Sequence, residues 1–158
     1  MTELTKVARA ELLFTPTFAE LCDFLSIKIL KSIFLVQNKK DFEEEIRLVM
    51  KDLELHIEKR GIKFSAEMIR ALMILMFSNR FIWENENLAR SGNEQDAKLL
   101  IISHKANGVR NLAKNVIANE LGERVDLKTD SIKNDTLMDG KMDFTNLFFD
   151  IWKLWSPP

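Results

Sequence analysis

Turn-forming residues are scarce in this 158-residue chain, which contains five glycines, three prolines and no tyrosine. A sheet of many strands needs a turn about every ten residues, and turns draw heavily on glycine and proline. The shortage therefore argues against a many-stranded β fold and favours an all-α domain. The single cysteine, Cys22, excludes an internal disulfide, and its apolar neighbours favour a position in the core.

Long apolar runs and an excess of charge are lacking too. No stretch approaches the roughly 20 apolar residues of a membrane-spanning helix, because charged residues interrupt both of the most apolar windows. Charged residues also interrupt the N-terminal stretch where a secretory signal would need an apolar run, so we expect a cytoplasmic protein. The formal net charge of −1 gives no overall attraction to nucleic acid or anionic lipid. Any such binding must be local.

Catalytic and metal-binding motifs are missing as well. The two histidines lie far apart, no Glu-x-x-His pair is present for a di-iron site, and no glycine-rich phosphate loop occurs. Asp135, Asp139 and Asp143 suggest a calcium loop, but Leu137 stands at a ligand position and Asn146 replaces the closing glutamate. We therefore expect no enzyme, no cofactor and no metal site.

What the chain does contain is helical periodicity. Every residue of the stretch 71–77 is apolar, and its alanine, leucine and methionine favour a helix over a strand. Ser65 is placed to cap the start of this helix, and Gly92 is the first strong terminator after it. We predict a central helix over residues 66–90, buried on all sides, around which the rest of the domain packs.

Five further helices are predicted around the central one from their caps and apolar spacing. They cover residues 2–14, 16–38, 41–60, 93–105 and 109–121. Thr15 is placed to cap the second with Pro16 in its first turn, and Gly61 to end the third. Between the last two, Ala106-Asn107-Gly108 predicts a tight turn. The sequence thus indicates a compact, bundle-like domain of about six helices over residues 1–125.

The chain changes character after this domain. Residues 126–142 are mostly polar and predict a linker. Over residues 143–158, large apolar side chains recur at helical spacing and would form one largely aromatic face: Phe144, Leu147, Phe148, Ile151, Trp152 and Trp155. An isolated helix this short is marginal in water. Its aromatic face therefore needs cover, either from the chain's own domain or from a partner.

A second candidate surface is electrostatic. From Lys98 to Asn119 the chain has no aspartate or glutamate. Several side chains in this stretch have the chemistry to contact phosphates or base edges: Lys98, His104, Lys105, Arg110, Asn111, Lys114 and Asn115. A helix, a glycine-containing turn and a helix suggest a helix-turn-helix. The fit is poor, because His104 and Lys114 stand where that motif usually has a small and an apolar residue.

The sequence therefore predicts an all-α protein that binds other molecules rather than one that catalyses a reaction. We expect an interaction or assembly module, of the kind used as an adaptor, accessory subunit or regulator. It would associate through the C-terminal aromatic helix with a protein partner or with a second copy of itself. The alternative is a nucleic-acid-associated protein that uses the basic surface over residues 98–119.

Overall fold

The computed structural model describes residues 14–89 and 96–126. Its elements are α2 (Phe18–Phe34), the short 3-10 helix η1 (Val36–Asn38), α3 (Lys39–Arg60), α4 (Ala66–Ala89) and α5 (Asp96–Glu120). The described ranges contain no strand, so the all-α prediction is confirmed for them. Nearly all of the helix predicted at 2–14, nearly all of the linker 126–142 and the whole aromatic helix at 143–158 lie outside the described residues.

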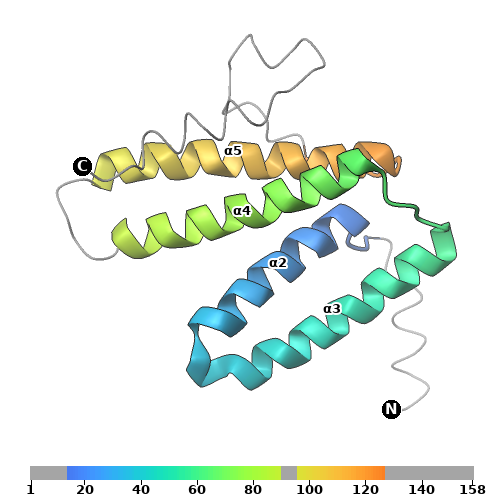
Figure 1. Cartoon of the computed structure of the whole chain (residues 1–158), viewed down its shortest axis with the longest axis horizontal. Coiled ribbons are helices and arrows are strands. Elements are labelled where there is room, and N and C mark those ends of the chain that lie inside the picture. Colours follow the sequence, from blue (N-terminus) through green and yellow to red (C-terminus); the bar gives the residue numbers. More distant parts are fainter. Residues whose placement is uncertain (1–13, 90–95, 127–158) are drawn as a thin grey trace, which may run out of the picture.

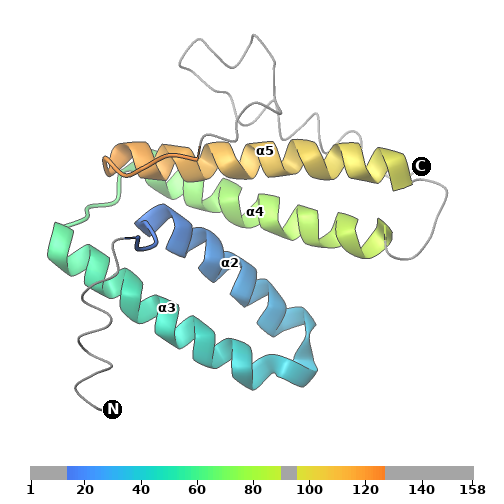
Figure 2. The same cartoon turned by 180° about the vertical axis from the view of Figure 1, so that it is seen from behind.

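The four α-helices form two antiparallel pairs, α2 with α3 and α4 with α5 (Figure 1). Seen from behind, α2 lies between α3 and the α4–α5 pair (Figure 2). It is also the helix that packs against each of the other three. The shared element of the domain is therefore α2, whereas the sequence pointed to the helix at 66–90.

The start of α2 is fixed by two acidic side chains. Thr17, not Thr15 as predicted, caps the helix: its hydroxyl accepts a hydrogen bond from the Glu20 amide at 3.1 Å, and the Glu20 carboxylate accepts one from the Thr17 amide at 2.8 Å. The Glu123 carboxylate, from the segment after α5, accepts hydrogen bonds from the Phe18 amide at 3.0 Å and the next amide at 3.3 Å. These bonds satisfy amides that a helix start leaves without partners.

Other helix ends follow the local sequence. Ser65 caps α4 as predicted, because its hydroxyl accepts a hydrogen bond from the Met68 amide at 3.0 Å. Gly61 ends α3 with a φ of 59°, in the left-handed region that favours glycine. The Glu123 carboxylate also forms an ion pair with Arg60, so the end of α3 is tied to the start of α2.

The predicted turn at Ala106-Asn107-Gly108 is wrong, because α5 is a single helix of 25 residues that passes through Gly108. A glycine inside a helix costs about 1 kcal/mol relative to alanine. The residues around Gly108 are buried between the helices, and the free energy gained by burying them outweighs that cost. Those that are at most 2% exposed are Ala106, Val109, Ala113 and Ile117. The predicted fifth and sixth helices are therefore one element.

Within residues 14–89 and 96–126, the core contains two clusters of buried side chains. The larger draws on all four α-helices and includes Phe18, Leu53, Leu75 and Ile117. The smaller cluster lies between the C-terminal half of α4 and the middle of α5, and contains Phe81, Ile82, Ala106 and Val109. Burying one large apolar side chain stabilises a fold by about 1.5–3 kcal/mol, so these clusters supply most of the force that holds the helices together.

The prediction that the helix at 66–90 is buried on all sides is wrong for the apolar run it contains. Ala71 and Leu75 are 1% exposed, but Met73 is 61% and Phe77 64% exposed. The physical reason is the arrangement of the pairs: α2 and α5 pack against α4, while α3 packs on α2 (Figure 1). The other helices that the structure describes therefore leave one face of α4 uncovered.

A buried polar cluster joins α2, α4 and α5. The Asp23 carboxylate accepts hydrogen bonds from Arg110 Nη2 at 2.6 Å and Nε at 2.9 Å, and from Asn79 Nδ2 at 2.9 Å. Asn79 also donates to the Ser26 hydroxyl at 2.6 Å. Asp23, Ser26 and Asn79 are all buried. The hydrogen-bonded Asp23 carboxylate raises the pKa of Arg110 above its ordinary value, so the guanidinium is held in its charged form.

Removing the carboxylate from this cluster should weaken the whole fold. We expect Asp23→Ala to lower the free energy of unfolding by about 3 kcal/mol, because it leaves the partly buried Arg110 without its counter-charge. Urea unfolding followed by circular dichroism measures the change. Glu44→Ala is the control, since it removes an exposed ion pair with Arg47 and should leave stability unchanged. Equal stability of Asp23→Ala and the unchanged chain would contradict this role.

The buried polar residue Asn85 of α4 should lower the stability of the fold. Asn85 is 0% exposed, and neither atom of its side-chain amide has a hydrogen-bond partner among the residues that the structure describes. A buried polar group without a partner costs about 1–3 kcal/mol. We therefore expect Asn85→Leu, which has nearly the same shape, to raise the free energy of unfolding by about 1–2 kcal/mol in the same assay. A lower value than that of the unchanged chain would show that the amide has a stabilising role.

Candidate functional site

An apolar groove of about 300 Å³ lies between α2, α3 and α4. Its walls are built mainly from aliphatic, methionine and cysteine side chains, among them Cys22, Leu25, Ile29, Met50, Leu72 and Met76. Phe64, in the connection between α3 and α4, also belongs to the lining. Concave apolar surfaces of this size are the usual form of a binding site. The groove is therefore the candidate functional site of the described chain.

The groove follows from how the helices share their apolar faces. On α2, the lining residues Phe18, Cys22, Leu25 and Ile29 recur at spacings of three and four, so they form one stripe along the helix. α3 packs on α2 at one side of this stripe, and α4 packs on α2 at the other. Because α2 separates them, α3 and α4 leave the space over the stripe open. The residues of this stripe thus belong to the core and also form the wall of the groove.

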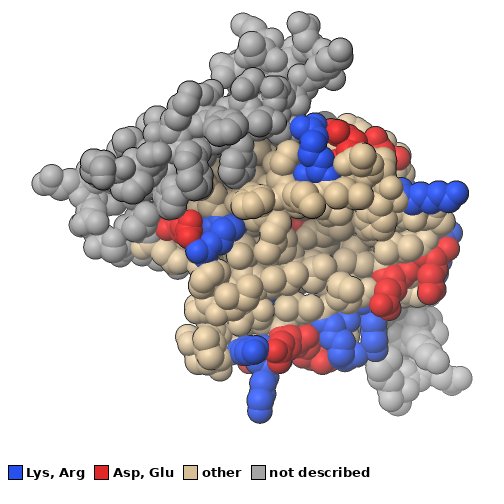
Figure 3. Space-filling model, in the orientation of Figure 1, with Lys and Arg blue, Asp and Glu red and all other residues tan. Residues whose placement is uncertain are grey.

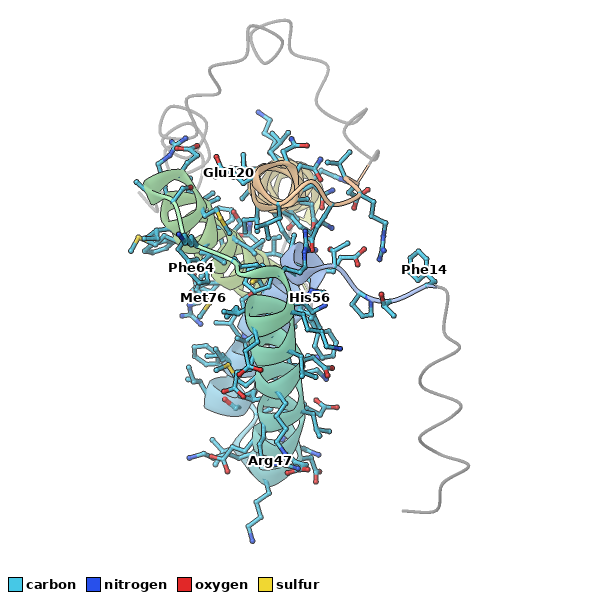
Figure 4. All side chains as sticks on the ribbon, turned by 90° about the vertical axis from the view of Figure 1, so that its right-hand side faces the viewer. Phe14, Arg47, His56, Phe64, Met76 and Glu120 are labelled. Atoms are coloured by element: carbon cyan, nitrogen blue, oxygen red, sulfur yellow. The ribbon has the colours of Figure 1, made fainter. Side chains whose placement is uncertain are left out.

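Charge is unevenly distributed over the face of the domain that Figure 3 shows, and Glu54 is the one charged residue of the groove lining. In the space-filling view, lysine, arginine, aspartate and glutamate side chains gather near the margins, while the centre of this face is uncharged (Figure 3). The groove residues Phe64 and Met76 lie on one side of the bundle, and His56 and Phe14 lie on the other (Figure 4). Two residues of the groove lining are themselves well exposed, Met50 at 43% and Phe64 at 45%. Apolar patches of this kind mark interaction sites.

Cys22 contributes packing to the groove rather than reactivity. It is 9% exposed, which confirms the predicted core position. Burial raises the pKa of its thiol to about 12, and the nearby carboxylates of Glu123 and Asp23 add to the effect. A thiol with this pKa is protonated at neutral pH, and the protonated form is a poor nucleophile. The side chain therefore acts as a small apolar group in the groove wall.

This protonation state predicts how Cys22 responds to pH. We expect slow alkylation by iodoacetamide at pH 7 in the folded chain, and a rise in rate only as the pH climbs from about 9 toward 12. Folding favours the protonated thiol, so stability falls over that same interval. Mass spectrometry of the modified chain measures the rate, with urea-unfolded chain as the control. Equal rates in folded and unfolded chain at pH 7 would contradict the burial of the thiol.

A second concavity, of about 550 Å³, lies at the side chains of Asp52, His56 and Arg60. His56 packs there with its ring centre 6.4 Å from that of Phe18. Arg60 is held by Glu123 and donates a hydrogen bond to the Leu121 carbonyl at 2.5 Å. Within the described residues, no group of three histidine, cysteine, aspartate or glutamate side chains could hold a metal ion. This concavity mixes charged and apolar side chains, whereas the groove is lined almost entirely by apolar ones, so the groove is the better candidate site.

Three of the predicted basic-surface residues are engaged within the chain. Arg110 binds Asp23 in the buried cluster, and Lys114 Nζ lies 3.0 Å from an Asp126 carboxylate oxygen. Asn115 exchanges two hydrogen bonds with the Asp126 backbone, at 2.8 and 2.9 Å. These side chains hold α5 to α2 and to the segment that follows α5. To contact a nucleic acid they would have to give up these bonds.

The remaining residues of the predicted basic surface share α5 but not these roles. His104 and Lys105 are exposed, Asn111 is half-buried, and the Lys98 side chain is outside the description. Because α5 is continuous through Gly108, the helix-turn-helix that would present them is absent. Nucleic-acid binding by this surface stays a prediction. The predicted partner-binding residues, from Phe144 to Trp155, lie outside the described residues.

Comparisons of the chain with protein-family models, with curated proteins and with solved structures find no match. Among the helices that the structure describes, none combines the length and the apolar character that crossing a membrane requires. The function must therefore be inferred from the geometry of the groove and from the sequence. Sequence analysis had missed this groove, because the α2 stripe from Phe18 to Ile29 was read only as core.

Proposed function

We propose that the protein is an interaction module whose groove between α2, α3 and α4 binds an amphipathic helix with large apolar anchors. The observation that carries this proposal is the groove itself, a concave apolar surface bordered by exposed methionine and phenylalanine side chains. Helix-binding grooves of other proteins have this form, and they accept anchors spaced by three or four residues. The function is thus recognition of one helix by three others.

The lining favours aromatic anchors. Met50 and Met76 come from opposite walls, α3 and α4, and methionine side chains adapt their shape and make favourable contacts with aromatic rings. Two aromatic anchors that each bury roughly 200 Å² would supply about 10 kcal/mol before the costs of association are subtracted. We therefore expect a dissociation constant in the micromolar range, typical of a reversible regulatory or assembly contact.

The titratable groups in the groove favour binding over catalysis. Glu54 and Cys22 are the ionisable side chains of its lining. The raised pKa of Cys22 keeps its thiol protonated at neutral pH, so the pair does not provide a nucleophile and a base. Proposed roles such as adaptor, accessory subunit or regulator need only the apolar surface.

A peptide with the sequence of residues 141–158 is a suitable probe, because it carries aromatic anchors at helical spacing. The receptor is the full chain with Leu147→Asp and Trp152→Asp, so that its own C-terminal residues cannot compete. Fluorescence anisotropy of the labelled peptide should give a micromolar dissociation constant. We expect Met76→Glu, added to this receptor, to weaken binding at least about 10-fold, because it puts a carboxylate into the apolar groove.

Met73→Glu is the matched control, since Met73 lies on the same helix but outside the groove lining and is 61% exposed. It should change the affinity by no more than about 2-fold. Circular dichroism checks that both variants keep their helices. The proposal fails if the receptor does not bind the peptide, or if the two glutamate variants weaken binding equally.

A further inference from the structure

We infer that the resident ligand of the groove is the chain's own C-terminal segment, residues 143–155, docked within the same molecule. An external helix must then displace this segment to bind. The inference rests on the proposed function of the groove and names its occupant. The support comes from the sequence of the segment, from the dimensions of the groove and from the point where the described chain ends.

The segment matches the groove in pattern and in length. Six large apolar side chains between Phe144 and Trp155 would share one face of a helix, and this face would extend about 16 Å. The α2 stripe that lines the groove, from Phe18 to Ile29, covers the same number of residues and therefore the same length. The anchors of the segment can contact the part of the α2 wall that is not fully buried, which includes Leu25 and Ile29.

The described chain ends at a fixed point from which the groove can be reached. Asp126 is held on α5 by Lys114 and by two hydrogen bonds with Asn115. The segment after α5 runs back along that helix (Figure 2). Residues 127–143 then precede Phe144 and can span about 55 Å when extended. That exceeds the length of α5, about 37 Å, so the connection can pass around the bundle to the groove.

The connection also favours the same molecule over a second copy. A tethered segment of this kind has an effective concentration of about 1 mM at its own binding site. With an intrinsic dissociation constant of about 10 μM, the docked state would exceed the undocked state by about 100 to 1. A second copy would reach the same occupancy only at millimolar protein concentration. The segment is therefore the resident ligand of the groove in the isolated chain, and a competing helix must displace it.

Disulfide trapping in the full chain tests the location of the segment. Cys22→Ala removes the native thiol, Thr145→Cys places a thiol beside the aromatic face, and Met50→Cys or Met76→Cys places one in the groove. We expect a disulfide within the monomer for at least one groove position, detected by mass spectrometry. The control is Leu55→Cys, which lines the second concavity. Disulfides found only between chains, or an equal yield with Leu55→Cys, would overturn the inference.

The probe peptide separates this inference from the proposed function. The unchanged full chain should bind it about 100-fold more weakly than the Leu147→Asp, Trp152→Asp receptor, because the native segment competes for the groove. Equal affinity of the two chains would overturn the resident segment but leave the groove's function intact. Absence of binding to either chain would overturn both.

Discussion

The contact between Asp23 and Arg110 holds the domain in the form that creates the groove. It fixes α2 to α5, and Asn79 extends the same cluster to α4. At the start of α2, Glu123 caps the first turn and pairs with Arg60 of α3. α2 is thus tied to all of its neighbours by buried or partly buried charges. Because its apolar stripe is the shared wall of core and groove, these charges also fix the shape of the groove.

Local signals predicted the helices well and their packing less well. The caps at Ser65 and Gly61 were correct, since a cap depends only on the few residues around it. The turn expected at Gly108 was wrong because the cost of one helical glycine is smaller than the gain from burying its neighbours against α4. The full burial expected for the run 71–77 was wrong because the number of helices that surround α4 is not encoded in its own residues. The exposed Met73 shows this directly.

The candidate site was harder to predict, because it is assembled from three helices. The sequence pattern of an apolar stripe such as Cys22, Leu25 and Ile29 is the same whether the stripe faces a core or a groove. The basic residues of α5 present the converse problem: Arg110 looks free in sequence, but its partner Asp23 stands 87 residues earlier in the chain. Only the aromatic periodicity after residue 143 pointed to a docking event, and the groove supplies the surface to which that pattern can now be matched.

The most direct test of this account is a nuclear Overhauser experiment on the full chain with ¹³C-labelled methionine methyl groups. If an aromatic helix occupies the groove, the methyl groups of Met50 and Met76 show contacts to the ring protons of Trp152 or Trp155, whereas that of Met73, outside the groove lining, does not. If Met50 and Met76 show contacts only to residues of the described domain, the groove is empty in the intact chain and the claim that the C-terminal segment occupies it is wrong.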